Sequence, residues 1–378
     1  MALTYIIGNG FDVNLKLKTR YADFYEVYIN EETRNGNIAR FKHSILKYMK
    51  NYYQEDVEVN KEILESYVNW ADFEHQMGIY SQKFTADRAA SEFAECLADF
   101  VMSFNKYLLK QCNSIDWNSV IGADGTRIRE EFVASIVRPQ DKLIDEELKD
   151  ILDCAIKKIR TVNFLQFNYT NVFDKLLDMS GFLDQLVLNY IKYGRNEIRN
   201  HLAKFGVNLH VHGEMGLDNF ITMGVDNPSQ IDNPFLRGNA AVLKTFVKQS
   251  KLDVDERRSR DLRIERELAK KTIKDTDVFC AFGASIGDTD KFWWKLVGKR
   301  LQCNTESLFV IFDISGIQSV NPVLDFFNRV DSTREEEITH RFLRNAEMPI
   351  DWAEKNPNRI IVQLDTGMFG MNELPKRT

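Results

Sequence analysis

Four segments of this chain place small or polar residues directly after an apolar run, as nucleotide-binding α/β proteins do. They are Gly8-Asn9-Gly10-Phe11-Asp12, Asn168-Tyr169-Thr170-Asn171, His212-Gly213 and Gly283-Ala284-Ser285-Ile286-Gly287-Asp288. Glycine lets the backbone take positive φ and approach a ligand, and free amides after such a turn can receive an anion. The first segment lacks the third glycine of a GxGxxG fingerprint. Alone, it fits a nucleotide loop and a plain strand-to-helix turn equally well.

Three side chains in these segments could take part in catalysis. Asn168 could orient a ribose hydroxyl or a water, and His212 could act as a general base or hydrogen-bond partner. Asp12 could stabilise a developing positive charge. Structural roles compete with these, because Asn168 and Thr170 could cap a helix and His212 could be an ordinary buried histidine.

A metal site is not expected. His210 and His212 stand two apart on an expected strand and would face the same side, but no third ligand lies near them in the sequence. The five cysteines form no CxxC pair, a pattern typical of reduced thiols in the cytoplasm.

Composition excludes some partners. The formal net charge of −6 disfavours a nucleic-acid surface, which needs clustered Lys and Arg. No apolar run approaches the roughly twenty residues of a membrane helix, and the first strand begins where a signal peptide would stand. We therefore predict a cytoplasmic protein without membrane contact.

The pattern of apolar residues predicts an α/β fold, namely a Rossmann-like, mostly parallel sheet flanked by helices, with a large helical insertion after the first strand. Near-continuous apolar runs are typical of parallel strands buried on both faces. Expected strands cover residues 3–7, 162–167, 209–212, 220–223, 278–282, 308–312 and 360–364. The predicted division is an α/β core of residues 1–18 and 160–378, with a helical insertion of residues 19–159.

Three local predictions accompany this division. We expect Thr19 to cap the first helix of the insertion. Asp290 is expected to cap a later helix, the one that carries Trp293 and Trp294. The charged run 253–274 is expected to form a solvent-facing helix. Residues 224–226 follow another expected strand and would join the other strand ends at one crevice, since parallel strands bind ligands beyond their carboxyl ends.

Together these segments resemble the abortive-infection AbiH family, whose members combine an N-terminal GNGFD turn with a later NYT, an HG and a GxSxGDxD-like segment. The resemblance covers essentially the whole chain, including residues 19–24 and 69–74 of the helical region. It implies bacterial defence against phage, in which infected cells stop growing or die. This role is compatible with a phage-derived trigger as a partner and with a homo-oligomer.

A more distant similarity is to sirtuin-like NAD-binding domains. It implies NAD or a related nucleotide as substrate or ligand, with no tightly bound cofactor. The binding residues that fall in the same order are Gly8, Asn9, Gly10, Thr170, Gly213, Gly283 and Ser285. Two further expected binding residues come from the segments themselves: Phe11, and Asp288, which could accept from a ribose hydroxyl. The chain departs from that pattern at Thr170, where an aspartate is expected, and at Gly8–Gly10, which lacks the GAGxS form. It also lacks a four-cysteine zinc module, which argues against a peptide deacylase.

The leading hypothesis is an enzyme that cleaves the N-glycosidic bond of NAD or a related nucleotide. Its oxocarbenium-like transition state needs a carboxylate or dipole and a positioned water, so Asp12, Asn168 and His212 are the expected catalytic residues. A nucleotide-binding sensor without turnover is the alternative. Its partner surface would be the aromatic residues of the insertion: Tyr48, Tyr52, Tyr53, Tyr67 and Trp70. A metal-dependent nuclease toxin has less support, because the chain is acidic.

Overall fold

The computed structural model of the 378-residue chain describes residues 1–44, 70–85, 88–122, 125–181, 185–192, 197–216, 221–250, 257–314, 333–364, 367–371 and 373–377. Side chains are described for all of these except residues 70–72, 185–192, 197–200 and 257–259. The aromatic residues expected to form a partner surface, Tyr48 to Trp70, therefore lie outside the described side chains.

A seven-stranded sheet forms the centre of the fold, in the order β3-β4-β2-β1-β5-β6-β7. Its strands are β1 (Ala2–Ile7), β2 (Thr161–Gln166), β3 (Gln185–Lys192), β4 (Glu197–His210), β5 (Val278–Phe282), β6 (Leu308–Phe312) and β7 (Ile360–Gln363). Every neighbouring pair is parallel except β3 and β4, which form an antiparallel hairpin at one edge. Numbered without β3, the parallel strands follow the order 3-2-1-4-5-6 of dinucleotide-binding folds. The predicted Rossmann-like fold is thus confirmed.

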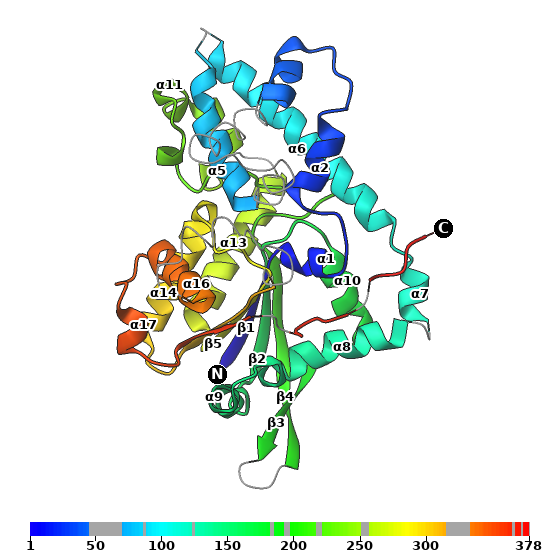
Figure 1. The fold of residues 1–378 in the computed structure, drawn as a ribbon, viewed down its shortest axis with the longest axis vertical. Helices are drawn as coiled ribbons and strands as arrows, with labels where there is room; N and C mark the ends of the chain where they lie inside the picture. The colour runs from blue at the N-terminus through cyan, green and yellow to red at the C-terminus, as the bar shows by residue number, and fades with distance from the viewer. Residues whose placement is uncertain are drawn as a thin grey trace.

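Helices cover both faces of the sheet, which explains the continuous apolar runs of its strands. β5 and β6 are buried along their whole length, and β2 is buried from its second residue. Alternate side chains of β1 enter separate cores, with Tyr5 and Ile7 in one and Ile6 in the other. In Figure 1, α13 (Arg257–Asp275), α14 (Lys291–Cys303) and α16 (Arg334–Asn345) lie on one side of the sheet, and α8 (Thr126–Val137) and α10 (Val172–Met179) on the other.

The described part of the segment between β1 and β2 is helical, as predicted. It contains α1 (Gly10–Asn14), α2 (Tyr21–Tyr28), α5 (Trp70–Tyr80), η1 (Ser81–Lys83), α6 (Ala89–Asn113), α7 (Trp117–Ile121), α8, η3 (Pro139–Lys142) and α9 (Glu146–Ile156). Figure 1 shows α2, α5 and α6 beyond the carboxyl ends of the parallel strands. Aromatic rings hold these three helices together, since Tyr21 stacks on Phe73 at 4.1 Å and on Phe104 at 5.6 Å.

The remaining elements connect the later strands. They are η4 (Pro228–Gln230), α11 (Pro234–Arg237), α12 (Ala240–Phe246), η6 (Asp288–Asp290) and α17 (Trp352–Lys355). No helix within the described ranges is both long and apolar enough to cross a bilayer.

Some local predictions are wrong. Residues 221–223 form no strand, because the backbone there bonds singly to other segments: the Thr222 amide donates to the His212 carbonyl at 2.7 Å. Thr19 does not cap α2, whose N-cap is Arg20. The sequence also did not predict β3 or the first part of β4, where polar residues interrupt the apolar pattern of a strand.

Candidate functional site

The turns after β1 and β5 touch each other through their backbones. The Gly8 amide donates to Phe282 O and the Gly10 amide to Gly283 O, both at 2.9 Å. A Cβ on Gly283 would lie 2.6 Å from Gly10 Cα, and one on Gly8 would lie 2.4 Å from Gly283 O. This contact falls between β1 and β5, where the strand order reverses and Rossmann-type proteins bind ligands. The glycines are therefore required for packing between the two turns.

Two amides of the first turn are engaged within the protein. Gly10 N–H donates to Gly283 O, and Phe11 N–H donates to Gly8 O at 3.0 Å. The expectation of free amides for an anion is wrong for these two groups. Asn9 is half-buried, and its Nδ2 donates to Thr19 O at 3.1 Å.

The segment after β5 carries backbone strain. Gly283 has φ +65°, and Ile286 has φ +50°, which is unfavourable for a β-branched residue and costs about 1–3 kcal/mol. The buried Asn345 of α16 donates from Nδ2 to Ile286 O at 2.7 Å and so supports this conformation. The strained segment presents a half-buried Ser285 and an exposed Asp288. Strain of this kind gathers at binding sites.

Asp12 forms a buried polar group with residues that follow β2. Thr170 Oγ1 donates to Asp12 Oδ2 at 2.6 Å, and Asn168 Nδ2 donates to Thr170 Oγ1 at 3.0 Å. Asp12, Thr170 and Asn168 are 0%, 1% and 3% exposed. Asn168 Oδ1 accepts from the Tyr169 amide at 2.8 Å, while the N-cap of α10 is Asn171. Asn168 and Thr170 thus contact Asp12 rather than cap the helix.

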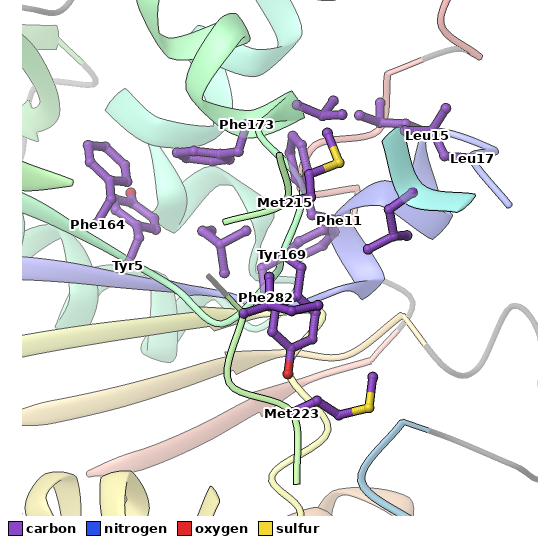
Figure 2. Close-up of a cluster of buried hydrophobic side chains, with 14 of the residues drawn as sticks. Tyr5, Phe11, Leu15, Leu17, Phe164, Tyr169, Phe173, Met215, Met223 and Phe282 are labelled. Carbon is purple, nitrogen blue, oxygen red and sulfur yellow. The ribbon is translucent and has the colours of Figure 1, made fainter. Parts of the chain in front are cut away.

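Burial raises the pKa of Asp12 to about 6, and the hydrogen bonds from Thr170 and Asn168 only partly oppose it. Asp12 Oδ1 has no hydrogen-bond partner among the described residues. The adjacent Phe11 lies in an aromatic cluster with Phe173 at 5.1 Å and Phe282 at 6.4 Å (Figure 2). This packing anchors α1 and places the Asp12 carboxylate beside the end of β2.

His212 lies in the turn that follows β4. Its Nε2 is 2.9 Å from Asp290 Oδ1, and its ring faces Phe167 and Tyr169 at centroid distances of 5.3 and 6.2 Å. The ring is 2% exposed, and this burial lowers the pKa of His212 to about 4 despite the nearby carboxylate. The imidazole is neutral at pH 7. The neighbouring Gly213 has φ +78°, which the turn requires.

Lys248 pairs with the buried Glu74 and the partly buried Asp290 beside His212. Its Nζ lies 2.8 Å from Glu74 Oε2 and 2.9 Å from Asp290 Oδ1, and it donates to Thr289 O at 3.1 Å. Burial alone would lower the pKa of Lys248, but Asp290 and Glu74 raise it above its ordinary value. Burial would raise the pKa of Asp290, yet Lys248 and His212 hold it well below its usual range. Both groups are therefore charged.

Sequence reasoning assigned Asp290 to helix capping, and this is wrong. Asp290 is the N-cap of α14 by position, but its side chain makes no capping hydrogen bond because Lys248 and His212 attract it. Asp226, from the segment expected to join the crevice, instead accepts from the Phe292 amide in the first turn of α14 at 3.3 Å.

Lys248, Glu74 and Arg266 are the site residues that sequence reasoning missed. Arg266 is 1% exposed on α13, whose charged residues were expected to face solvent, and its guanidinium lies 5.0 Å from the Trp293 ring. Burial lowers the pKa of Arg266 to about 10. Of these three residues, Glu74 alone could have been found from the sequence, because it ends a segment that resembles the family. A single lysine or arginine among other charged residues gives no indication that it is buried.

His210 belongs to a separate group. Its Nε2 contacts Asp174 Oδ1 of α10 at 3.1 Å, so the two histidines have different partners. β4 ends at His210, which places His212 outside the strand and removes the reason to expect both on one side. Within the described ranges, no three His, Cys, Asp or Glu side chains gather closely enough to hold a metal ion.

The structure brings the expected site residues together in two groups. Asp12, Thr170 and Asn168 form one, and Tyr169 links it to His212 because its ring faces the imidazole. Gly8, Gly10 and Gly283 form the other at the ends of β1 and β5, with Ser285 two residues on. Asp288 lies apart on η6, where its carbonyl accepts from Gln230 Nε2 at 3.2 Å.

Six parallel strands in Rossmann order, with helices on both faces (Figure 1), place the chain among Rossmann-like α/β proteins. The family model for bacteriophage abortive infection protein AbiH matches residues 4–312, and the chain belongs to the AbiH family. The match includes every candidate site residue and supports a function in phage abortive infection. No curated protein matches the chain.

Gly283→Ala should destabilise the fold by about 3 kcal/mol, because the left-handed backbone and the contact with Gly10 both disfavour a Cβ. Gly181→Ala is the matched control, since Gly181 has φ +75° but no atom within 4 Å of its Cβ position. Gly181→Ala should lower the free energy of unfolding by only about 1 kcal/mol, which is the cost of the left-handed backbone without a packing clash. Urea unfolding measures both, and equal losses would contradict the packing role of Gly283.

Asp12→Asn should stabilise the protein above pH 6. The unfolded state releases the Asp12 proton near the ordinary pKa of 3.8 and the folded state only near 6, so wild-type stability falls as pH rises between these values. Asparagine removes this loss of about 3 kcal/mol at pH 7.5 and should change little at pH 4. The exposed Asp261→Asn is the control, and urea unfolding at both pH values is the measurement. A gain that does not depend on pH would refute the assignment.

Proposed function

We propose that this AbiH protein binds NAD or a related dinucleotide at the carboxyl ends of β1, β2, β4 and β5 and hydrolyses its N-glycosidic bond during phage infection. The observation that supports this most is the buried Asp12 carboxylate, joined to Thr170 and Asn168 beside the reversal of strand order. Dinucleotides bind at this reversal in folds of the same strand order.

The reaction needs no co-reactant besides water. The water oxygen bonds to C1′ of the ribose, the C1′–N bond breaks, and its electron pair returns to the pyridinium nitrogen. Nicotinamide leaves as a neutral base, ADP-ribose is the second product, and the water gives up one proton. Positive charge develops on the ribose in the transition state, so a carboxylate that is already in place lowers the barrier.

The chain's residues match these requirements. Asp12 Oδ1 accepts no hydrogen bond from the part of the chain that the structure describes, and the carboxylate supplies negative charge when ionised. Asn168 donates from Nδ2 to Thr170 and also bonds Asp12, so in this proposal it holds the carboxylate in place beside the ribose. The neutral His212 imidazole can accept a hydrogen bond from that water.

The strand-end turns supply the binding surface in this proposal. Gly8, Gly10 and Gly283 keep the turns narrow through their mutual contact, so backbone rather than side chains borders the site. Ser285 offers a hydroxyl from the strained segment after β5. No cofactor is needed, because the nucleotide is the substrate.

A nucleotide-binding sensor without turnover is the second candidate. The observation that favours it is the burial of Asp12 and His212, which are 0% and 2% exposed. Groups so deeply buried reach a substrate only after the surrounding segments move. A sensor would use the same residues to hold the nucleotide.

We expect the purified chain to release nicotinamide from NAD, measured by chromatography with NADP and ATP in parallel. Asp12→Asn and His212→Asn should each lower the rate by about 100-fold or more, the usual effect of removing a group that stabilises the transition state. Asp261→Asn and His340→Asn are matched controls at exposed positions. Unchanged cellular NAD during infection, together with intact phage protection and no release in vitro, would reject hydrolysis and favour the sensor.

The release rate should also depend on pH. If ionised Asp12 stabilises the transition state, activity falls as pH drops through about 6, the pKa of this carboxyl. The residual activity of Asp12→Asn should lack this decline. A decline of equal size in both proteins would assign it to another group.

A further inference from the structure

A line of buried charges runs from the helical region to His212. Glu74 lies on α5, Lys248 follows α12, and Asp290 ends η6. Glu74 Oε2 lies 2.8 Å from Lys248 Nζ, Lys248 Nζ lies 2.9 Å from Asp290 Oδ1, and the same Asp290 oxygen lies 2.9 Å from His212 Nε2. Glu74 and Lys248 are 0% and 2% exposed, so solvent does not screen these contacts.

Backbone hydrogen bonds fix the first two members in place. Glu74 Oε1 accepts from the Gly224 amide at 3.1 Å. Lys248 donates from Nζ to Thr289 O at 3.1 Å, and its own amide donates to Val225 O at 2.9 Å. Two carboxylates at this depth are tolerated only with a cation between them. The arrangement is therefore a fixed ion-pair line rather than an adaptable surface pair.

The contact between Asp290 and His212 affects the imidazole directly. Asp290 Oδ1 lies 2.9 Å from His212 Nε2, so its negative charge acts on the ring at close range. Nε2 and Nδ1 are both buried, and neither makes a hydrogen bond of good geometry to the described residues. Either nitrogen could accept a hydrogen bond from a water or a substrate when the ring is neutral. Asp290 is available for this contact because Asp226 accepts the amide of α14.

We propose that Glu74, Lys248 and Asp290 together set the electric field at His212, so that α5 of the helical region controls the charge of its imidazole. The inference rests on the proposed function only for the part that His212 plays in hydrolysis. Arg266 on α13 is the other charged group that acts on His212, and its positive charge adds to that of Lys248. Glu74 and Asp290 balance these two cations.

The proposal is tested by NMR of protein labelled at its six histidines, with the His212 signal assigned through His212→Asn. Glu74→Gln removes a negative charge and should lower the protonation midpoint of His212. Lys248→Met removes a positive charge and should raise it. Each shift should be roughly one pH unit for a buried charge near the ring. General loosening of the site would move both midpoints in one direction, toward the value of a solvated histidine.

The double variant Glu74→Gln/Lys248→Met covers the case in which Lys248→Met alone fails to fold. It removes both charges at once, and its midpoint should lie above that of Glu74→Gln, because the positive charge of Lys248 is also gone. Lys295→Met is the matched control, because Lys295 pairs with Glu347 at 2.7 Å while 43% exposed. It should leave the His212 signal unchanged.

An unchanged His212 midpoint in Glu74→Gln would overturn the proposal, as would a double-variant midpoint no higher than that of Glu74→Gln, or shifts of the same sign in both single variants. The NMR measurement needs no nucleotide. If wild-type protein releases no nicotinamide from NAD, the proposed hydrolysis is rejected. The charge effect on His212 is decided separately by the NMR midpoints.

Discussion

The backbone contact between the turns after β1 and β5 is the constraint on which the rest of the site depends. The two strands pair in register up to Ile7 and Phe282, and the chain then leaves toward opposite faces of the sheet. Because glycine backbones touch at this point, no side chain separates the turns. The same contact therefore fixes where α1 begins, which directs Asp12 toward β2. It also fixes where the strained segment after β5 begins, which leads to Asp290. One packing contact thus sets the positions of both carboxylates, which have different partners.

The groups placed in this way lower the stability of the fold rather than raise it. Among the described residues, a carboxylate with one oxygen that accepts no hydrogen bond and a buried lysine between two carboxylates are both more costly than apolar residues of similar size. The aromatic packing around Phe11 and between α2, α5 and α6 offsets this cost. Buried charges kept against a stability cost are more common at functional sites than elsewhere. The candidate site is therefore proposed at Asp12 and at the charges beside His212 rather than at the glycines, whose packing already explains them.

The sequence predicts the parallel strands and the helical region well, because a strand buried on both faces leaves a continuous apolar run such as residues 278–282. It also predicts that Asn168, Thr170 and His212 lie at strand ends. It does not show that Thr170 faces Asp12, since that contact joins residues far apart in the chain. Lys248 and Arg266 were not predicted for the same reason. A charged side chain is buried only when other elements supply its partners, and the local sequence pattern does not reveal those partners. The capping role given to Asp290 was wrong because a lysine from a distant segment outweighs the local preference for a helix N-terminus.

Tyr169 connects the two parts of the molecule at the site. Its backbone follows β2, its ring faces His212, and its hydroxyl donates to Thr222 O at 3.2 Å, toward the end of the cluster that holds Met223 (Figure 2). The same ring meets Phe104 of α6 at 6.2 Å. A close-packed interior transmits displacement through such contacts, because no voids absorb it. Helix α6 thus meets the Tyr169 ring, while Glu74 of α5 pairs with Lys248 beside His212. The helical region therefore contacts the polar residues at the strand ends both by packing and by an ion pair.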